Sequence, residues 1–225
     1  MKRAREFMTD GRMAWMLIVA ILVIDQIIKI EVKTTMTLGQ SYHVTDWFYI
    51  YFIENNGMAY GMTFINKFFL SIFRIVAISV IGWYIWHVVK RKGRTRYVFF
   101  LSLIMAGAAG NIFDSMFYGL IFSASSPYYV SYFVPFGTGY SSFLMGKVVD
   151  MFYFPIIQTT WPDWVPVWGG DEFIFFSPIF NFADACITVG VICLLLFCRK
   201  DFGNGDTKKG VEPTPEASKS QGENQ

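Results

Sequence analysis

The sequence has 225 residues, 54% of them hydrophobic and 19% aromatic, and a formal net charge of +2 at pH 7. Several apolar runs are long enough to cross a bilayer as helices, which takes about 20 residues. The composition therefore argues against a soluble globular domain. The small net charge, with no basic recognition motif, argues against a nucleic-acid partner.

In chain order, four apolar segments are predicted to span the membrane: residues 14–30, 68–89, 97–113 and 182–198. The expected fold is an all-α integral membrane protein, a bundle of four transmembrane helices. The basic N-terminal stretch resembles the start of a signal peptide, but no small-x-small cleavage site follows it. The first span is therefore expected to be retained.

Basic residues predict the orientation of the spans. Of the 19 Lys and Arg residues, 14 lie before the first span, in the loop 90–96 or after the last span. Because basic residues favour the cytoplasmic side, both termini are predicted to be cytoplasmic. Residues 1–200 are expected to form one membrane domain, and the polar tail 201–225 is expected to be disordered.

The two remaining connections are predicted to lie outside the cell membrane as a small region of strands and loops. The stretch TDWFYIYFIENNGMAYG, residues 45–61, favours a short strand followed by an Asn-Gly turn. The long stretch 120–181 is rich in Tyr, Phe, Trp, Gly and Pro, which is typical of a structure lying on a membrane surface.

Polar residues from five separate segments are predicted to converge near the outer membrane surface. An Asp in hydrocarbon costs roughly 2.5–3.5 kcal/mol, so Asp184 in the fourth span is a candidate functional residue. Pairs spaced by three residues share one helix face. The converging residues are Asp25, Asn55, Asn111, Asp114, Asp150, Asn181 and Asp184.

Each of these residues also has a purely structural interpretation. Asp184 could cap a helix, and Asp25 could pair with Lys29 four residues later. Independent caps would not all fall on one side of the bilayer, so the convergence favours a shared site. Two close carboxylates that share a proton can activate water, as in aspartic proteases. The motifs HExxH and GxSxG are absent, and neither a metal nor a cofactor is expected.

Five blocks, in this order, resemble those of bacterial lipoprotein signal peptidase (signal peptidase II). They are DQIIK (25–29), ENNGMAYG (54–61), AGAAGNIFDS (106–115), VVDMF (148–152) and FNFADACITVG (180–190). The matches extend over most of the chain, and the last block agrees almost residue for residue.

The resemblance implies an aspartyl endopeptidase that cuts lipid-modified prolipoproteins just before the lipidated cysteine. It implies Asp150 and Asp184 as catalytic residues. The supporting residues that it implies are Asp25, Lys29, Asn55, Gly57, Gly110, Asn111, Asp114 and Asn181. The expected location is the bacterial inner membrane, with the active site at its extracytoplasmic face. Expected partners are the prolipoprotein substrates and membrane lipids, and the expected oligomeric state is a monomer.

The sequence departs from the family pattern in two ways. Ser115 stands where the family has an Arg, and Arg74 in the second span could replace that charge or merely extend to the membrane surface. Residues 120–146 and 153–178 form unusually long connections, which could be a lid or an insertion for a partner.

Two other functions are compatible with intramembrane acids. A small proton-coupled transporter would distribute its acids across the depth of the bilayer, whereas these acids gather at one side. A non-catalytic assembly subunit would tolerate the loss of Asp150 or Asp184.

Overall fold

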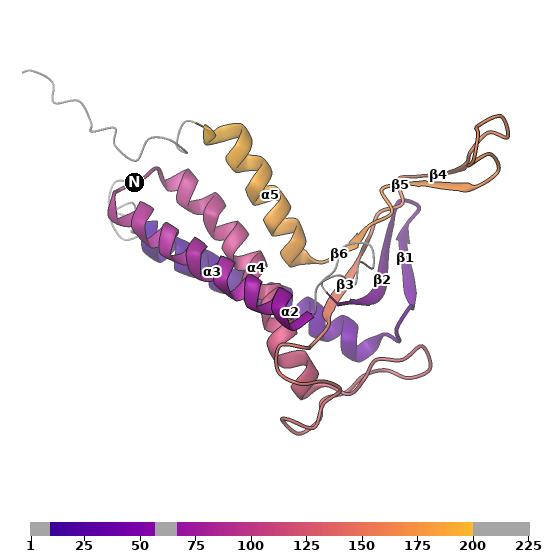
Figure 1. Ribbon diagram of the computed structural model, residues 1–225, viewed down its shortest axis with the longest axis horizontal. Helices are drawn as coiled ribbons and strands as arrows, with labels where there is room; N and C mark the ends of the chain where they lie inside the picture. Colours follow the sequence, from indigo (N-terminus) through magenta and orange to yellow (C-terminus); the bar gives the residue numbers. More distant parts are fainter. Residues whose placement is uncertain (1–9, 57–66, 200–225) are drawn as a thin grey trace, which may run out of the picture.

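The computed structural model describes residues 10–56 and 67–199. The helices run side by side, and a β-sheet lies beyond one end of them (Figure 1). The helices are α2 (Asp10–Thr35), α3 (Lys67–Lys90), α4 (Thr95–Ile121) and α5 (Phe182–Phe197). The strands are β1 (Ser41–Thr45), β2 (Phe48–Asn55), β3 (Val148–Tyr153), β4 (Ile157–Thr160), β5 (Glu172–Phe175) and β6 (Ile179–Phe180).

Helix α4 lies at the centre of the helices and packs against α2, α3 and α5. It approaches α5 closely because Gly107 has no side chain: a Cβ there would lie 2.3 Å from the carbonyl oxygen of Ala183. Small residues allow this kind of close helix contact in membranes. Helices α2, α3 and α4 are long and apolar enough to cross a membrane, and α5 is a shorter apolar helix.

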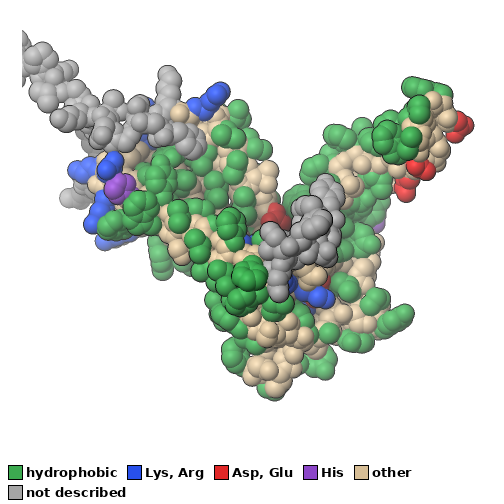
Figure 2. All heavy atoms as spheres, viewed as in Figure 1, with side chains coloured by type: hydrophobic (Ala, Val, Ile, Leu, Met, Phe, Trp, Pro, Cys, Tyr) green, Lys and Arg blue, Asp and Glu red, His purple; other side chains and the backbone are tan. Residues whose placement is uncertain are grey.

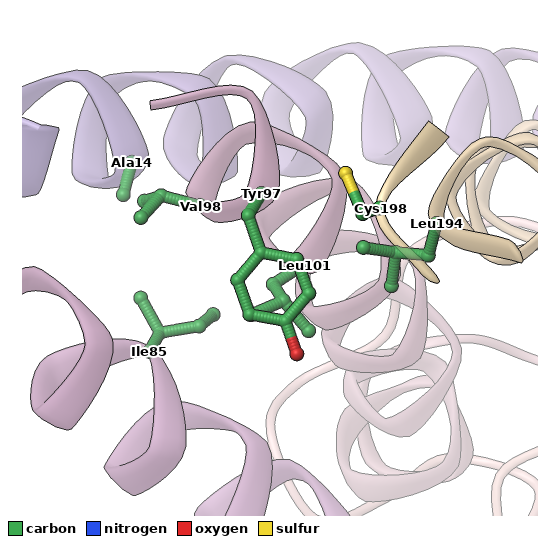
Figure 3. Packing of buried hydrophobic residues seen from close by; sticks show 7 residues of the cluster. All are labelled: Ala14, Ile85, Tyr97, Val98, Leu101, Leu194 and Cys198. Atoms are coloured by element: carbon green, nitrogen blue, oxygen red, sulfur yellow. The ribbon is translucent and has the colours of Figure 1, made fainter. Parts of the chain in front are cut away.

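Two features mark the end of the helices that lies away from the sheet. Lys and Arg side chains gather there, around the connection between α3 and α4 (Figure 2). A buried apolar cluster to which all four helices contribute closes the same end (Figure 3). Its residues are Ala14, Ile85, Tyr97, Val98, Leu101, Leu194 and Cys198.

The sheet at the opposite end has the strand order β1-β2-β3-β6, and its paired strands are antiparallel. Phe52, Val149 and Met151 point to one face and pack with Tyr118 and Phe122 at the end of α4. Because side chains alternate along a strand, Asp150 points to the other face. The separate hairpin β4–β5 projects away from the helices (Figure 1).

The structure adds three features that the sequence analysis did not specify. Asp150 lies on β3, and the fold contains more β-structure than the sequence suggested. Helices α2 and α4 continue past the predicted spans to Thr35 and Ile121, because the polar residues at their ends are paired within the fold. The glycine of the predicted Asn-Gly turn and the tail 201–225 lie outside the described residues.

Candidate active site

Lys29 of α2 is completely buried and contacts two carboxylates and an amide. Its Nζ lies 2.9 Å from Asp25 Oδ2 and 2.8 Å from Asp114 Oδ2, and it donates to Asn111 Oδ1 at 2.9 Å. The pairing of Asp25 with Lys29, given above as the structural interpretation of Asp25, is present, and Asn111 and Asp114 share one face of α4. A buried ammonium group is tolerated here because three acceptors surround it.

Both carboxylates also accept hydrogen bonds from groups other than Lys29. The backbone N–H of Ala183 donates to Asp25 Oδ1 at 3.0 Å, and that of Val149 donates to Asp114 Oδ2 at 3.4 Å. A Cβ at Gly110 would lie 2.6 Å from Asp25 Oδ2, so only glycine leaves room for this carboxylate. These contacts join α2 and α4 to the start of α5 and to β3.

Two asparagine amides connect the Lys29 group to the predicted catalytic residues. Asn111 accepts from Lys29 through Oδ1, and its Nδ2 donates to Asp184 Oδ1 at 2.7 Å. Asn181 donates through Nδ2 to Asn111 Oδ1 at 3.1 Å and to Asp150 Oδ1 at 2.6 Å. Since Lys29 can only donate, it fixes which end of the Asn111 amide faces Asp184.

Asp184 occupies the third position of α5, within a reciprocal capping motif. Asn181 Oδ1 accepts from the backbone N–H of Asp184 at 2.9 Å, and Asp184 Oδ2 accepts from the backbone N–H of Asn181 at 3.4 Å. The structural and functional interpretations of Asp184 are therefore compatible. One oxygen supports the helix terminus and the other faces Asn111, and the side chain remains partly exposed.

Asp150 is buried, with 2% of its surface exposed. Asn55 Nδ2 donates to its Oδ2 at 3.2 Å, so each carboxylate oxygen has an amide donor. Burial, followed by the negative charge of Asp184, raises the pKa of Asp150 to about 7. Asp150 can thus hold a proton near neutral pH while Asp184 lies close enough to influence it.

Arg74 of α3 is partly buried, and its charge interacts with the charges of Asp184, Asp150 and Asp114. Ser115, where the family pattern has Arg, is completely buried, and its hydroxyl donates to Asn111 O at 3.2 Å. These electrostatic interactions are the ones that the compensation hypothesis requires of Arg74.

The structure brings together almost all of the residues that the sequence placed in the site. They are Asp25, Lys29, Asn55, Gly110, Asn111, Asp114, Asp150, Asn181 and Asp184. Gly57 lies outside the described residues. Within residues 10–56 and 67–199, no group of three or more His, Cys, Asp or Glu side chains is placed to hold a metal ion.

Sequence reasoning missed two sets of polar residues that contact the site or its neighbours. Gln26 donates to Asp114 Oδ1 at 2.8 Å and accepts from Tyr118 OH at 3.0 Å. Lys33 pairs with Glu54 at 2.5 Å. The spacing of Asp25, Lys29 and Lys33 by four residues could have revealed Lys33, because it places all three on one helix face.

Comparisons with known proteins agree with the geometry. The family model described as "Signal peptidase (SPase) II" matches residues 17–199. A protein named lipoprotein signal peptidase from Porphyromonas gingivalis (strain ATCC 33277) is 52% identical over 188 residues, which cover 83% of each chain. A protein of the same name from Amoebophilus asiaticus (strain 5a2) is 38% identical over 78% of this chain and 72% of its own.

A solved structure, described as a bacterial membrane enzyme, has a similar fold. The TM-score is 0.56 at 23% identity, and the alignment covers 88% of this chain and 94% of that one. The apolar helices and these matches together show a membrane-embedded protein.

Proposed function

Because the chain belongs to the signal peptidase II family and is a membrane protease of prolipoproteins, we propose that Asp150 and Asp184 are its catalytic pair. The observation that carries this assignment is the joint anchoring of the two carboxylates. The Asn181 side chain donates to Asp150, its backbone N–H donates to Asp184, and Asn111 links the Asn181 side chain to Asp184. The two residues of the proposed pair come from β3 and α5.

The proposed reaction is hydrolysis of the peptide bond just before the lipidated cysteine. Asp184, as the ionised member, takes a proton from water while the water oxygen attacks the scissile carbonyl carbon. Asp150, as the protonated member, donates its proton to the carbonyl oxygen. As the C–N bond of the tetrahedral intermediate breaks, Asp184 donates its proton to the leaving amine and Asp150 takes a proton back from a hydroxyl of the gem-diol. The pair therefore ends with the single shared proton with which it began.

The buried groups around the pair prepare it for this cycle. Lys29, Asn111 and Asn181 are held by several hydrogen bonds each, so they need not rearrange when charge moves during the reaction. Asn55 and Asn181 leave Asp150 with satisfied oxygens, while burial keeps its affinity for a proton high.

We further propose that all four helices span the bacterial inner membrane, within one domain covering residues 1–200. The 16 residues of α5 give about 24 Å, which falls short of the hydrocarbon thickness of about 30 Å, so the bilayer would have to thin locally. The basic end shown in Figure 2 would face the cytoplasm, with both termini there. The sheet and the carboxylate pair then lie at the extracytoplasmic face.

The aromatic connections are proposed to lie on the outer membrane surface and to control access to the site. The hairpin β4–β5 and its loop expose Trp164, Val167 and Trp168, and Trp is typical of membrane interfaces. The enzyme is proposed to act as a monomer that binds lipid-modified prolipoproteins from the surrounding lipid.

The test is cleavage by the purified protein of a lipidated prolipoprotein and of its unlipidated form. Asp150→Asn and Asp184→Asn should each abolish cleavage of the lipidated form, because an amide cannot carry out the proton cycle. A double variant should be little worse than either single one, since the pair acts as a unit. Exposed Asp163→Asn is the matched control. Substantial cleavage by either single variant would refute the assignment.

A further inference from the structure

Another buried carboxylate, that of Glu54, lies on the strand that carries Asn55 and does not belong to the proposed catalytic pair. Its side chain is 2% exposed and pairs with Lys33 Nζ at 2.5 Å and with Lys147 Nζ at 3.0 Å. Ser125 Oγ donates to the same carboxylate at 2.7 Å. We call Lys33, Glu54, Ser125 and Lys147 the Glu54 cluster.

The Glu54 cluster joins segments that are far apart in sequence. Lys33 comes from the last turns of α2, Glu54 from β2, and Ser125 and Lys147 from the two ends of the connection between α4 and β3. Lys33 Nζ also donates to Ser125 Oγ at 2.8 Å. The carboxylate of Glu54 therefore joins the end of α2 to β2. It also holds both ends of the connection between α4 and β3 against them.

The groups around Glu54 stabilise its ionised form. Burial would raise the pKa of Glu54, but the charges and hydrogen bonds of Lys33, Ser125 and Lys147 outweigh burial and lower it. The carboxylate is thus ionised at neutral pH. A buried ion pair that loses one partner is strongly destabilised, so the position of Glu54 is tightly determined.

Because Glu54 and Asn55 are neighbours on one strand, the position of Glu54 determines that of Asn55, which contacts Asp150. Glu54 and Asn55 are the last two residues of β2, and successive side chains point to opposite faces of a sheet. Glu54 lies on the face that carries Phe52, whereas Asn55 donates to Asp150 Oδ2 at 3.2 Å on the other face. The pairing of β2 with β3 ends here, at Asn55 opposite Val148.

We propose that the Glu54 cluster is a positioning device for the proposed catalytic pair: it holds the end of β2 so that Asn55 bonds Asp150 and tunes its proton affinity. This inference rests on the catalytic role proposed for Asp150. The other charged groups that act on Asp150 are Asp184 of α5, Lys29 of α2 and Arg74 of α3. Asp114 of α4 accepts from the neighbouring residue Val149.

Glu54→Gln separates positioning from simple electrostatics, because the two effects have opposite signs. Removal of a nearby negative charge favours ionised Asp150 and lowers its pKa. Loss of the Asn55 hydrogen bond disfavours ionised Asp150 and raises its pKa, by about one unit for a bond to a charged group. Positioning therefore predicts an upward shift, whereas a downward shift or none would overturn the proposal.

The measurement is the infrared C=O stretch of protonated Asp150, titrated in full-length protein in lipid nanodiscs and assigned by its loss in Asp150→Asn. Ser125→Ala changes no charge and should raise the pKa of Asp150 by less than Glu54→Gln does. Ser131→Ala is the matched control, because its buried hydroxyl bonds Ser123 in the same connection outside the cluster. If Glu54→Gln does not fold, the test is the comparison of Ser125→Ala with Ser131→Ala. Equal pKa values of Asp150 in these two variants overturn the proposal.

A double variant tests whether the effect passes through Asn55. Asn55→Ala should raise the pKa of Asp150, and adding Glu54→Gln should raise it no further. An additional upward shift of this pKa would contradict an effect that passes through Asn55. The infrared readout does not depend on cleavage. A shift in Glu54→Gln, together with a wild-type protein that fails to cut prolipoprotein, would leave the positioning role intact and refute the proposed function.

Discussion

Lys29→Met is expected to destabilise the fold severely, because it leaves two carboxylates buried without their shared cation. The side chains of Asp25, Lys29 and Asp114 are at most 1% exposed, and both ion-pair distances are below 3 Å. Breaking a buried ion pair by removing one partner costs about 3–5 kcal/mol. The backbone donors from Ala183 and Val149 remain, but they cannot replace a full positive charge.

The same substitution should also abolish cleavage beyond the effect of lower stability. Without Lys29, Asn111 Oδ1 loses its charged donor and keeps the weaker one from Asn181 Nδ2, so the amide that donates to Asp184 is held less firmly in its orientation. Activity normalised to the folded fraction should therefore still fall.

The assay is the free energy of unfolding in mixed micelles titrated with SDS, with cleavage measured on the same samples. Lys92→Met, an exposed lysine at the basic end, is the control and should change stability by less than about 0.5 kcal/mol. Adding Asp114→Asn to Lys29→Met should restore about 1–3 kcal/mol, because it removes one of the unpaired charges. A loss below about 1 kcal/mol in Lys29→Met would refute the reasoning.

Three further outcomes are expected. Cleavage should decline as the pH rises through about 7, because the pKa of Asp150 is raised to about 7 and its ionisation removes the acid of the pair; kcat that stays flat to about pH 9 would contradict this. Replacing residues 157–175 with a short Gly-Ser turn should preserve the fold and lower kcat/KM for lipidated substrate, since this hairpin projects from the sheet, and unchanged kinetics would show that it serves another purpose. Reporters fused after Lys92 and Lys209 should both indicate the cytoplasm, and an external signal from either would overturn the proposed orientation.

Much of the site could be predicted because its residues interrupt apolar helices at helical spacing. Asp25 and Lys29 are four apart, and Asn111 and Asp114 are three apart, so their shared faces follow from helix geometry alone. Polar residues inside apolar helices are conspicuous, because lipid offers them no partner. The fold supplies those partners through contacts between helices, as the sequence led us to expect.

The contacts that β2 and β3 make at the site could not be predicted, because they depend on strand pairing, which local sequence does not determine. The strand VVDMFY has apolar residues on both sides of Asp150, because one face packs on the core and the other faces the site, so the alternation that marks a strand is weak. The bond between Lys33 and Glu54 requires β2 to reach back over the end of α2. The spacing of 21 residues between them gives no signal for that contact.

Arg74→Ala is expected to lower kcat about tenfold or more, while Arg74→Lys retains most of it, because the compensation hypothesis assigns the benefit to a positive charge that acts on Asp184 and Asp150. A tenfold loss corresponds to about 1.4 kcal/mol of transition-state stabilisation. Adding Ser115→Arg to Arg74→Ala should restore part of the activity, since position 115 lies one turn beyond Asn111 on α4. Ser115→Arg alone should be harmful, because Ser115 is completely buried and Arg74 already supplies the charge. If Arg74 only extends towards the membrane surface, Arg74→Ala should cleave at the wild-type rate, as should Arg91→Ala at the opposite end of the helices. Equal rates for these two variants would leave Ser115 as an uncompensated departure from the family pattern.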